Sequence, residues 1–207
     1  MFSAPMVCAI LEGRKTQTRR AIVPTITETH CSKECACGGP SDWVWKSHRS
    51  PHVQQLAKFC PYGAPGDRLW VRETCLPDPP RDGSWDDCMY DGDQLYRNLS
   101  VIPENYRHPE HVIYRAAWTG DDLRWLPSIH MPRWASRITL EVADVRVQRV
   151  QEISEGDCLA EGCGAKDRRV FAELWDSINA KRGFGWEANP WVWAITFRRR
   201  DEQQPRA

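Results

Sequence analysis

Residues 137–150 read RITLEVADVRVQRV and form the clearest β-strand pattern of the chain. Ile138, Leu140 and Val142 alternate with polar neighbours, as expected for a strand with one buried face. The apolar positions then change phase to Val145 and Val147. A change of phase moves the buried side chains to the other face unless the strand bends or bulges, as strands do at a barrel corner. The sequence therefore predicts a long strand that bends near its middle.

Shorter elements precede and follow this strand. Apolar residues at helical spacing predict a helix at residues 4–12 and an amphipathic helix that begins near Phe171 and ends near Gly183. A third helix is expected between Ser154, which can cap it, and Gly162, which can end it. This mixture of elements predicts an α+β fold with a small barrel as its core. The remaining predicted strands are residues 16–23, 67–73, 111–117 and 191–197, in the last of which Trp191, Trp193, Ile195 and Phe197 alternate.

Length and composition limit the classes of protein to consider. The chain has 207 residues, 41% of them hydrophobic, with 28 basic and 28 acidic side chains and a formal net charge of zero. No apolar run approaches the roughly 20 residues that cross a bilayer, and the N-terminus lacks the pattern of a secretory signal. We therefore expect a cytoplasmic protein without a membrane partner. Zero net charge argues against nucleic-acid binding through a global basic field, although a local basic pocket is allowed.

The first candidate site is the basic segment that follows the predicted first helix. Residues 13–20 hold four cations after a glycine turn, so they could converge on an anion or a polar base. The alternative is a solvated basic loop. Lys15 and Thr18 would face opposite ways in a regular strand, so they can cooperate only if Lys15 still lies in the turn.

The second candidate is Glu161, in the last turn of its short predicted helix, just before Gly162. The helix dipole disfavours a negative charge at this end, which should raise the pKa of the carboxyl group and suits a general acid. The alternative is an exposed glutamate without a chemical role.

Several motifs resemble the ASCH domain family of the PUA-like superfamily. They are Gly13-x-Lys15-x-x-x-x-Arg20, Gly66-Asp67-x-Leu69, the helix from Ile153 to Gly162 and the final strand from Trp191 to Phe197. Residues 2–20, 60–73 and 128–135 are also similar to phage and prophage ASCH proteins. The resemblance implies one small PUA-like barrel with short flanking helices over residues 1–200. Loop insertions would lie at about 25–65 and 76–127, and residues 201–207 would form a polar tail.

The resemblance also implies an activity. Small bacterial ASCH proteins include an amidohydrolase that removes the acetyl group of 4-acetylcytidine, without a cofactor in the reaction. Its catalytic lysine and threonine lie in a Gly-x-Lys-x-x-Thr-x-Arg arrangement, and its catalytic glutamate lies near the end of the helix that follows the long strand. Carried over, these positions make Lys15, Thr18 and Glu161 the catalytic residues. Lys15 would activate the Thr18 hydroxyl, and Glu161 would protonate the leaving amine.

Other side chains are candidates for binding the modified nucleoside. Arg20 or backbone amides of the turn could stabilise an oxyanion, and an aromatic or imidazole ring could stack on the pyrimidine or hydrogen-bond to it. The alternative function is an RNA-binding or RNA-processing module, in which Arg14, Arg19, Arg20 and Arg72 contact phosphates. A metal-dependent nuclease lacks a compelling cluster of carboxylates. The substrate-binding candidates are Gly13, Arg14, Arg20, Trp70, Arg72 and His130.

Nine cysteines in a chain without a secretory signal are more typical of thiols or metal ligands than of disulfides. Cys31, Cys35 and Cys37 lie close together, and a Gly-Gly pair follows Cys37, as in a zinc knuckle. With Cys60 as a fourth ligand they would close a structural zinc site that staples a poorly hydrophobic insertion. The alternative is a set of free thiols.

Overall fold

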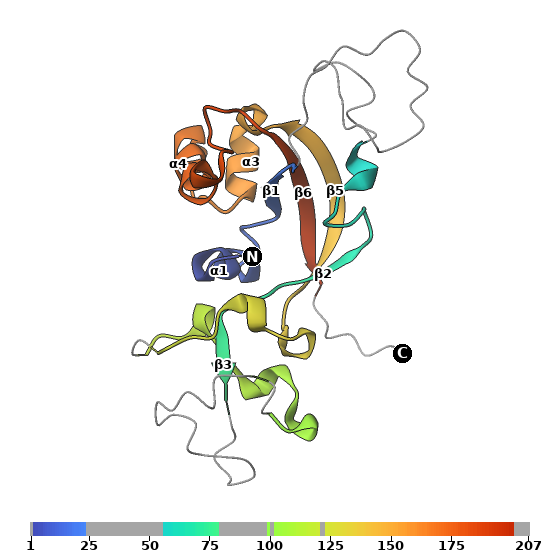
Figure 1. Cartoon of the computed structure of the whole chain (residues 1–207), viewed down its shortest axis with the longest axis vertical. Helices are drawn as coiled ribbons and strands as arrows, with labels where there is room; N and C mark the ends of the chain where they lie inside the picture. The colour runs from blue at the N-terminus through green and yellow to red at the C-terminus, as the bar shows by residue number, and fades with distance from the viewer. Residues whose placement is uncertain (1, 24–55, 79–98, 100–101, 121–122, 201–207) are drawn as a thin grey trace. The chain divides into compact units, whose positions relative to one another are not determined.

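The computed structural model describes residues 2–23, 56–78, 99, 102–120 and 123–200. Mixed helices and strands confirm the predicted α+β class (Figure 1). Within the described part, no helix has the length and apolar character needed to cross a bilayer. The helices are α1 (Ala4–Leu11), α3 (Glu155–Ala160) and α4 (Arg168–Asn179). The strands are β1 (Gln17–Ala21), β2 (Arg68–Trp70), β3 (Cys75–Pro77), β4 (Val112–Tyr114), β5 (Thr139–Arg149) and β6 (Trp191–Arg200).

The chain divides into two compact units, and short 3₁₀ helices accompany the main elements. The first unit comprises residues 1–13, 68–140 and 199–207, and the second comprises residues 14–67 and 141–198. The 3₁₀ helices are Leu56–Phe59, Glu104–Tyr106, Pro109–His111, Arg115–Ala117, Ser128–His130, Arg133–Ala135, Val150–Glu152 and Ala180–Arg182.

The main sheet has four strands in the order β1-β6-β5-β2 and is curled (Figure 1). Strand β1 pairs antiparallel with β6, with Gln17 opposite Thr196 and Ala21 opposite Val192. In β5, Leu140, Val142 and Val145 are buried, so the predicted change of phase in this strand is confirmed.

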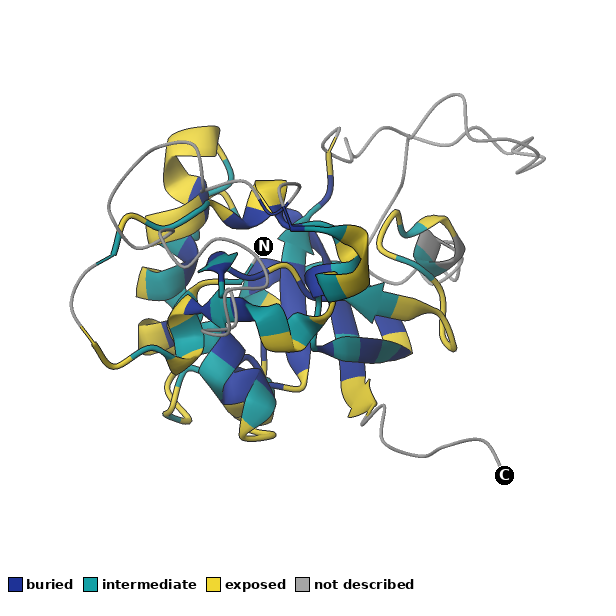
Figure 2. Ribbon diagram, turned by 90° about the horizontal axis from the view of Figure 1, so that it is seen from below, coloured by how far each residue is buried: buried dark blue, intermediate teal, exposed yellow. Residues whose placement is uncertain are grey.

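The burial of β6 differs from the predicted alternation. Residues from Trp191 to Ile195 are buried without interruption, as the dark blue stretches of Figure 2 illustrate for the sheet. This strand lies between β1 and β5, and Val192 on its second face packs into a cluster with Phe171 and Trp175 of α4. A central strand that is covered on both faces is buried along its whole apolar run, so its burial does not alternate.

The helices of the second unit largely agree with those predicted from the sequence. Ser154 and Asp157 form the predicted capping box of α3. In α4, Phe171 and Trp175 face the core, whereas Ile178 is exposed although its spacing matches the same apolar stripe. The neighbouring Asn179 is buried instead. Its side-chain amide donates a hydrogen bond to the Trp175 carbonyl, which takes the place of a hydrogen bond from the amide to water.

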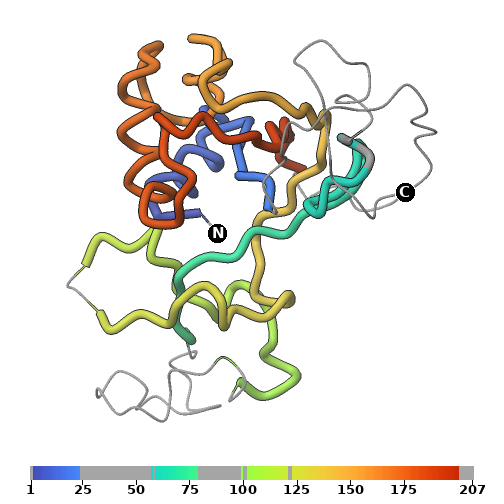
Figure 3. Tube along the Cα trace, turned by 45° about the horizontal axis from the view of Figure 1, so that its top comes forward, coloured from blue at the N-terminus to red at the C-terminus, as the bar shows by residue number. Residues whose placement is uncertain are grey.

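The first unit contains a second sheet, formed by the antiparallel strands β3 and β4 (Figure 3). A loop insertion is expected at about residues 76–127, yet this segment contributes most of β3 and two buried side chains, Leu99 and Ile102. These side chains join Cys75, Tyr114 and other apolar residues in one hydrophobic cluster. The loop prediction for this segment is therefore wrong in part, because its few apolar residues are far apart in sequence and show no local periodicity.

Candidate functional site

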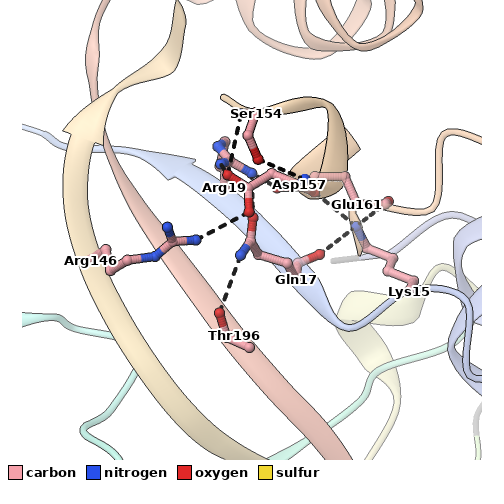
Figure 4. A network of polar contacts seen from close by, with 8 residues as sticks. All are labelled: Lys15, Gln17, Arg19, Arg146, Ser154, Asp157, Glu161 and Thr196. Atoms are coloured by element: carbon pink, nitrogen blue, oxygen red, sulfur yellow. Dashed lines mark hydrogen bonds and ion pairs between the residues drawn. The ribbon is translucent and has the colours of Figure 1, made fainter. Parts of the chain in front are cut away.

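Lys15 lies between the turn at Gly13, where φ is +74°, and the start of β1. Lys15 therefore lies after the turn and before the regular strand, so the condition for its cooperation with Thr18 is not met. The side chain is 2% exposed, which contradicts a solvated basic loop. Its Nζ donates to the Gln17 carbonyl at 2.9 Å, the Glu161 carbonyl at 2.6 Å and Glu161 Oε2 at 2.9 Å (Figure 4). These three acceptors match the three donors of an ammonium group.

Glu161 is the C-cap residue of α3 and is 5% exposed. Gly162 follows with φ of +81°, a left-handed conformation that favours glycine and ends the helix there. The backbone N–H of Thr16 donates to the Ala160 carbonyl at 2.8 Å, which fixes the segment before β1 against the end of α3. The structure therefore brings Lys15 and Glu161 together across 146 residues, as predicted, and contradicts the exposed alternative for Glu161.

Arg19 is a third charged residue of this site. Its Nη1 donates to Glu161 Oε1 at 3.0 Å and to Gln17 Oε1 at 2.6 Å, and its Nη2 donates to Asp157 Oδ2 at 2.9 Å. The side chain is 0% exposed, so the expectation that Arg19 is solvated or contacts phosphate is wrong. Strand alternation places Gln17 and Arg19 on one face of β1, and α3 lies against that face.

Asp157 connects this buried group to the surface. Its Oδ1 accepts from Nη2 of Arg146 at 3.2 Å, and the Arg146 side chain is 43% exposed. Partial burial would raise the pKa of Asp157, but the Arg19 guanidinium, the Ser154 backbone N–H and Arg146 outweigh it. Together they hold the pKa of this carboxyl group below its ordinary value of 3.8.

Thr18 is buried and lies opposite Ile195 in the sheet. Neighbouring residues of a strand point to opposite faces, so its side chain points away from the face shared by Gln17 and Arg19. The three acceptors of Lys15 Nζ named above belong to Gln17 and Glu161. The structure thus joins Lys15 to Glu161 but directs Thr18 elsewhere, and the expected hydrogen bond between Lys15 and Thr18 is replaced by the ion pair with Glu161.

The candidates for substrate binding fall into two groups. Arg14 is exposed and Arg20 is half-buried, next to the buried residues of β1. Trp70, Arg72 and His130 belong to the first unit. There, the Arg72 guanidinium lies over the Trp70 ring at 4.7 Å from its centroid and donates to the carbonyl of the residue before His130 at 3.3 Å. His130 itself is exposed.

The predicted zinc ligands Cys31, Cys35 and Cys37 lie outside the described residues. Cys60 is half-buried, and burial raises the pKa of its thiol. The ranges that the structure describes contain no group of three or more His, Cys, Asp or Glu side chains arranged to hold a metal ion. Zinc binding by the four cysteines therefore stays a prediction from the sequence.

Sequence reasoning missed Arg19, Gln17 and Asp157 as members of the site, although two spacings point to them. Lys15, Gln17 and Arg19 recur at every second position, which places their side chains on one face of an extended segment. Asp157 and Glu161 are four residues apart and therefore share one face of a helix. These two spacings, one typical of a strand and the other of a helix, were the signal in the sequence for a polar site between β1 and α3.

The arrangement can hold and transfer a proton. A carboxylate and an ammonium group are in contact at 2.9 Å, are almost closed to water, and are oriented by a buried guanidinium. No protein-family model matches the chain, and no match was found among curated proteins or solved structures.

Proposed function

We propose that this protein is an amidohydrolase with an ASCH-type, PUA-like fold that removes an acyl group from the exocyclic nitrogen of a modified cytidine such as 4-acetylcytidine. The observation that carries the proposal is the buried contact between Lys15 and Glu161. Both residue types stand where the resemblance implies catalytic groups, and they meet although 146 residues separate them.

A purely structural role explains this contact less well. Taking two charges out of water costs several kcal/mol per ion, and apolar residues of similar volume often stabilise a core as well or better. A buried lysine and glutamate therefore contribute little to stability. They can contribute much to catalysis, because a site closed to water strengthens their electrostatic effect on a reacting group.

The proposed reaction needs one base and one acid. Water and the amide give a carboxylic acid and cytidine, so a nucleophile must lose a proton and the leaving amine must gain one. When the shared proton moves from Lys15 Nζ to Glu161 Oε2, the amine becomes a base and the carboxyl group becomes an acid. In the proposal water is the nucleophile, because Thr18, which the resemblance implies for this role, points to the other face of β1. Gly13, Arg14 and Arg20 contact the substrate from the adjoining segment.

The test is a screen of acylated cytidines with the purified full-length protein, in which cytidine and the released acid are measured together. We expect equal amounts of both products, and turnover in Thr18→Ala within about tenfold of the wild type, because the Thr18 side chain points away from the pair. A loss of about a hundredfold in Thr18→Ala would assign the attack to the threonine hydroxyl instead of water. If no acylated pyrimidine is hydrolysed and RNA binds with an affinity that falls steeply with salt, the RNA-binding alternative replaces the proposal.

A further inference from the structure

The guanidinium of Arg19 is held by several hydrogen bonds at once. Acceptors from β1 and from α3 engage both of its terminal nitrogens at 2.6–3.0 Å. Its Nε, in contrast, is buried and has no hydrogen-bond partner among the described residues. Buried donors are usually satisfied, so an unsatisfied one has a cost. The position of the guanidinium therefore satisfies the contacts of its two terminal nitrogens and leaves Nε without a hydrogen bond.

One of these contacts fixes the carboxylate of Glu161. Oε1 accepts from Arg19 and Oε2 accepts from Lys15. The two carboxylate oxygens are therefore held by two cations that lie four residues apart in the sequence. A glutamate side chain otherwise has many rotamers, and this one extends from the C-cap position of a short helix. Without Arg19, a single contact at Oε2 would oppose its rotation away from Lys15.

Asp157 and Gln17 in turn hold Arg19. Asp157 accepts from Nη2 of Arg19 and also takes part in the capping box of α3. Gln17 accepts from Nη1 and donates through its own amide to Thr196 Oγ1 of β6 at 3.2 Å. The charged groups that face Glu161 are thus the cations Lys15 and Arg19, with Asp157 and the exposed Arg146 behind them (Figure 4).

We infer that Arg19 is the positioning residue of this site: it holds the Glu161 carboxylate in the orientation that meets the Lys15 ammonium. Its effect on catalysis rests on the proposed function, whereas its effect on the geometry of the pair does not. The family motif that the sequence resembles ends in Arg20, so the residue that does this work is its buried neighbour.

The test replaces Arg19 with lysine and measures the Lys15 ammonium group by NMR. The chain has six lysines, so selective isotope labelling gives a small set of signals. Arg19→Lys keeps the positive charge but cannot engage two acceptors with a rigid planar group. We expect the Lys15 ammonium hydrogens to exchange with water about tenfold faster or more in this variant. Arg198→Lys is the matched control, because Arg198 of β6 forms an exposed ion pair with Glu141, and it should leave the exchange unchanged.

Unchanged exchange at Lys15 in a folded Arg19→Lys protein would overturn the inference, because a purely structural arginine can lower the melting temperature without freeing Lys15. If that variant does not fold, Asp157→Asn serves instead, since it weakens the hold on Arg19 from a partly exposed position and should accelerate the exchange in the same direction. On an acylated cytidine, Arg19→Lys should lower kcat and leave KM nearly unchanged. Absence of turnover in the wild type counts against the proposed function alone, and the exchange rates still decide the role of Arg19.

Discussion

Lys15, Arg19 and Glu161 place ionisable groups in positions almost closed to water. The sequence could predict that Lys15 and Glu161 meet, because both stand in motif positions, one two residues after Gly13 and the other directly before Gly162. It could not predict that Arg19 is buried, since a run of cations is more often a solvated surface. Which cation turns inward depends on the acids that α3 presents to β1, and this is a property of the folded chain.

The burial of these charges changes what their removal should do to stability. A catalytic residue in an open cleft can usually be replaced without loss of folding stability. Because the structure pairs Lys15 and Glu161 inside the protein, Glu161→Gln should lower the free energy of unfolding by about 3–5 kcal/mol, since it leaves a buried cation without its partner. Urea unfolding measures this. Replacing the exposed Lys166 with methionine should change the same quantity by less than about 0.5 kcal/mol, and an equal loss in both variants would contradict the account.

Single elements were predictable where local chemistry determines them. The caps of α3 follow from Ser154, Asp157 and Gly162, whose roles depend on residues a few positions away. The continuous burial of β6 was not predictable, because it depends on which strands flank it and which helix covers its second face. Strand patterns predict one buried face reliably, whereas burial of the other face depends on tertiary packing.

The capping box of α3 predicts a pH dependence of stability. Asp157 has a pKa below 3.8 in the folded chain, so its ionised form stabilises the fold above that pH, and the stabilisation is lost as the pH falls through the lowered pKa. Asp157→Asn should therefore be less stable than the wild type at neutral pH, and the two should converge under acid conditions. Melting temperatures measured from neutral pH down to about pH 2 test this. A difference that stays constant over the whole range would mean that the charge of Asp157 does not matter.

At the scale of the whole molecule, the fold class was predictable and the pairing of distant segments was not. Local patterns indicated most helices and strands, although not β3, but the order β1-β6-β5-β2 joins segments from both ends of the chain. The hydrophobic cluster of the first unit likewise collects Cys75, Leu99 and Tyr114 from separate short segments. Such contacts depend on loop closure over long distances, which no local pattern encodes.

The cysteine-rich segment gives a prediction for the chain as purified. Cys31, Cys35, Cys37 and Cys60 should bind about one zinc ion per chain, as four thiolates complete a tetrahedral structural site. Elemental analysis of protein prepared without chelator measures the zinc content. A content below about a tenth of an equivalent, with all cysteines reacting freely, would remove the zinc site. A brief chelator treatment should leave turnover intact, because the proposed hydrolysis uses no metal.

The central claim is that Lys15 and Glu161 act as one hydrolytic unit, and a double-mutant cycle on turnover tests it most directly. Lys15→Met, Glu161→Gln and the double variant are compared with the wild type on the best acylated cytidine, with folded protein verified at the assay temperature. We predict that each single variant loses about a hundredfold in kcat or more and that the double variant loses hardly more than either, because residues that act together are strongly non-additive. Losses that multiply in the double variant, or full activity in Glu161→Gln, would contradict the claim.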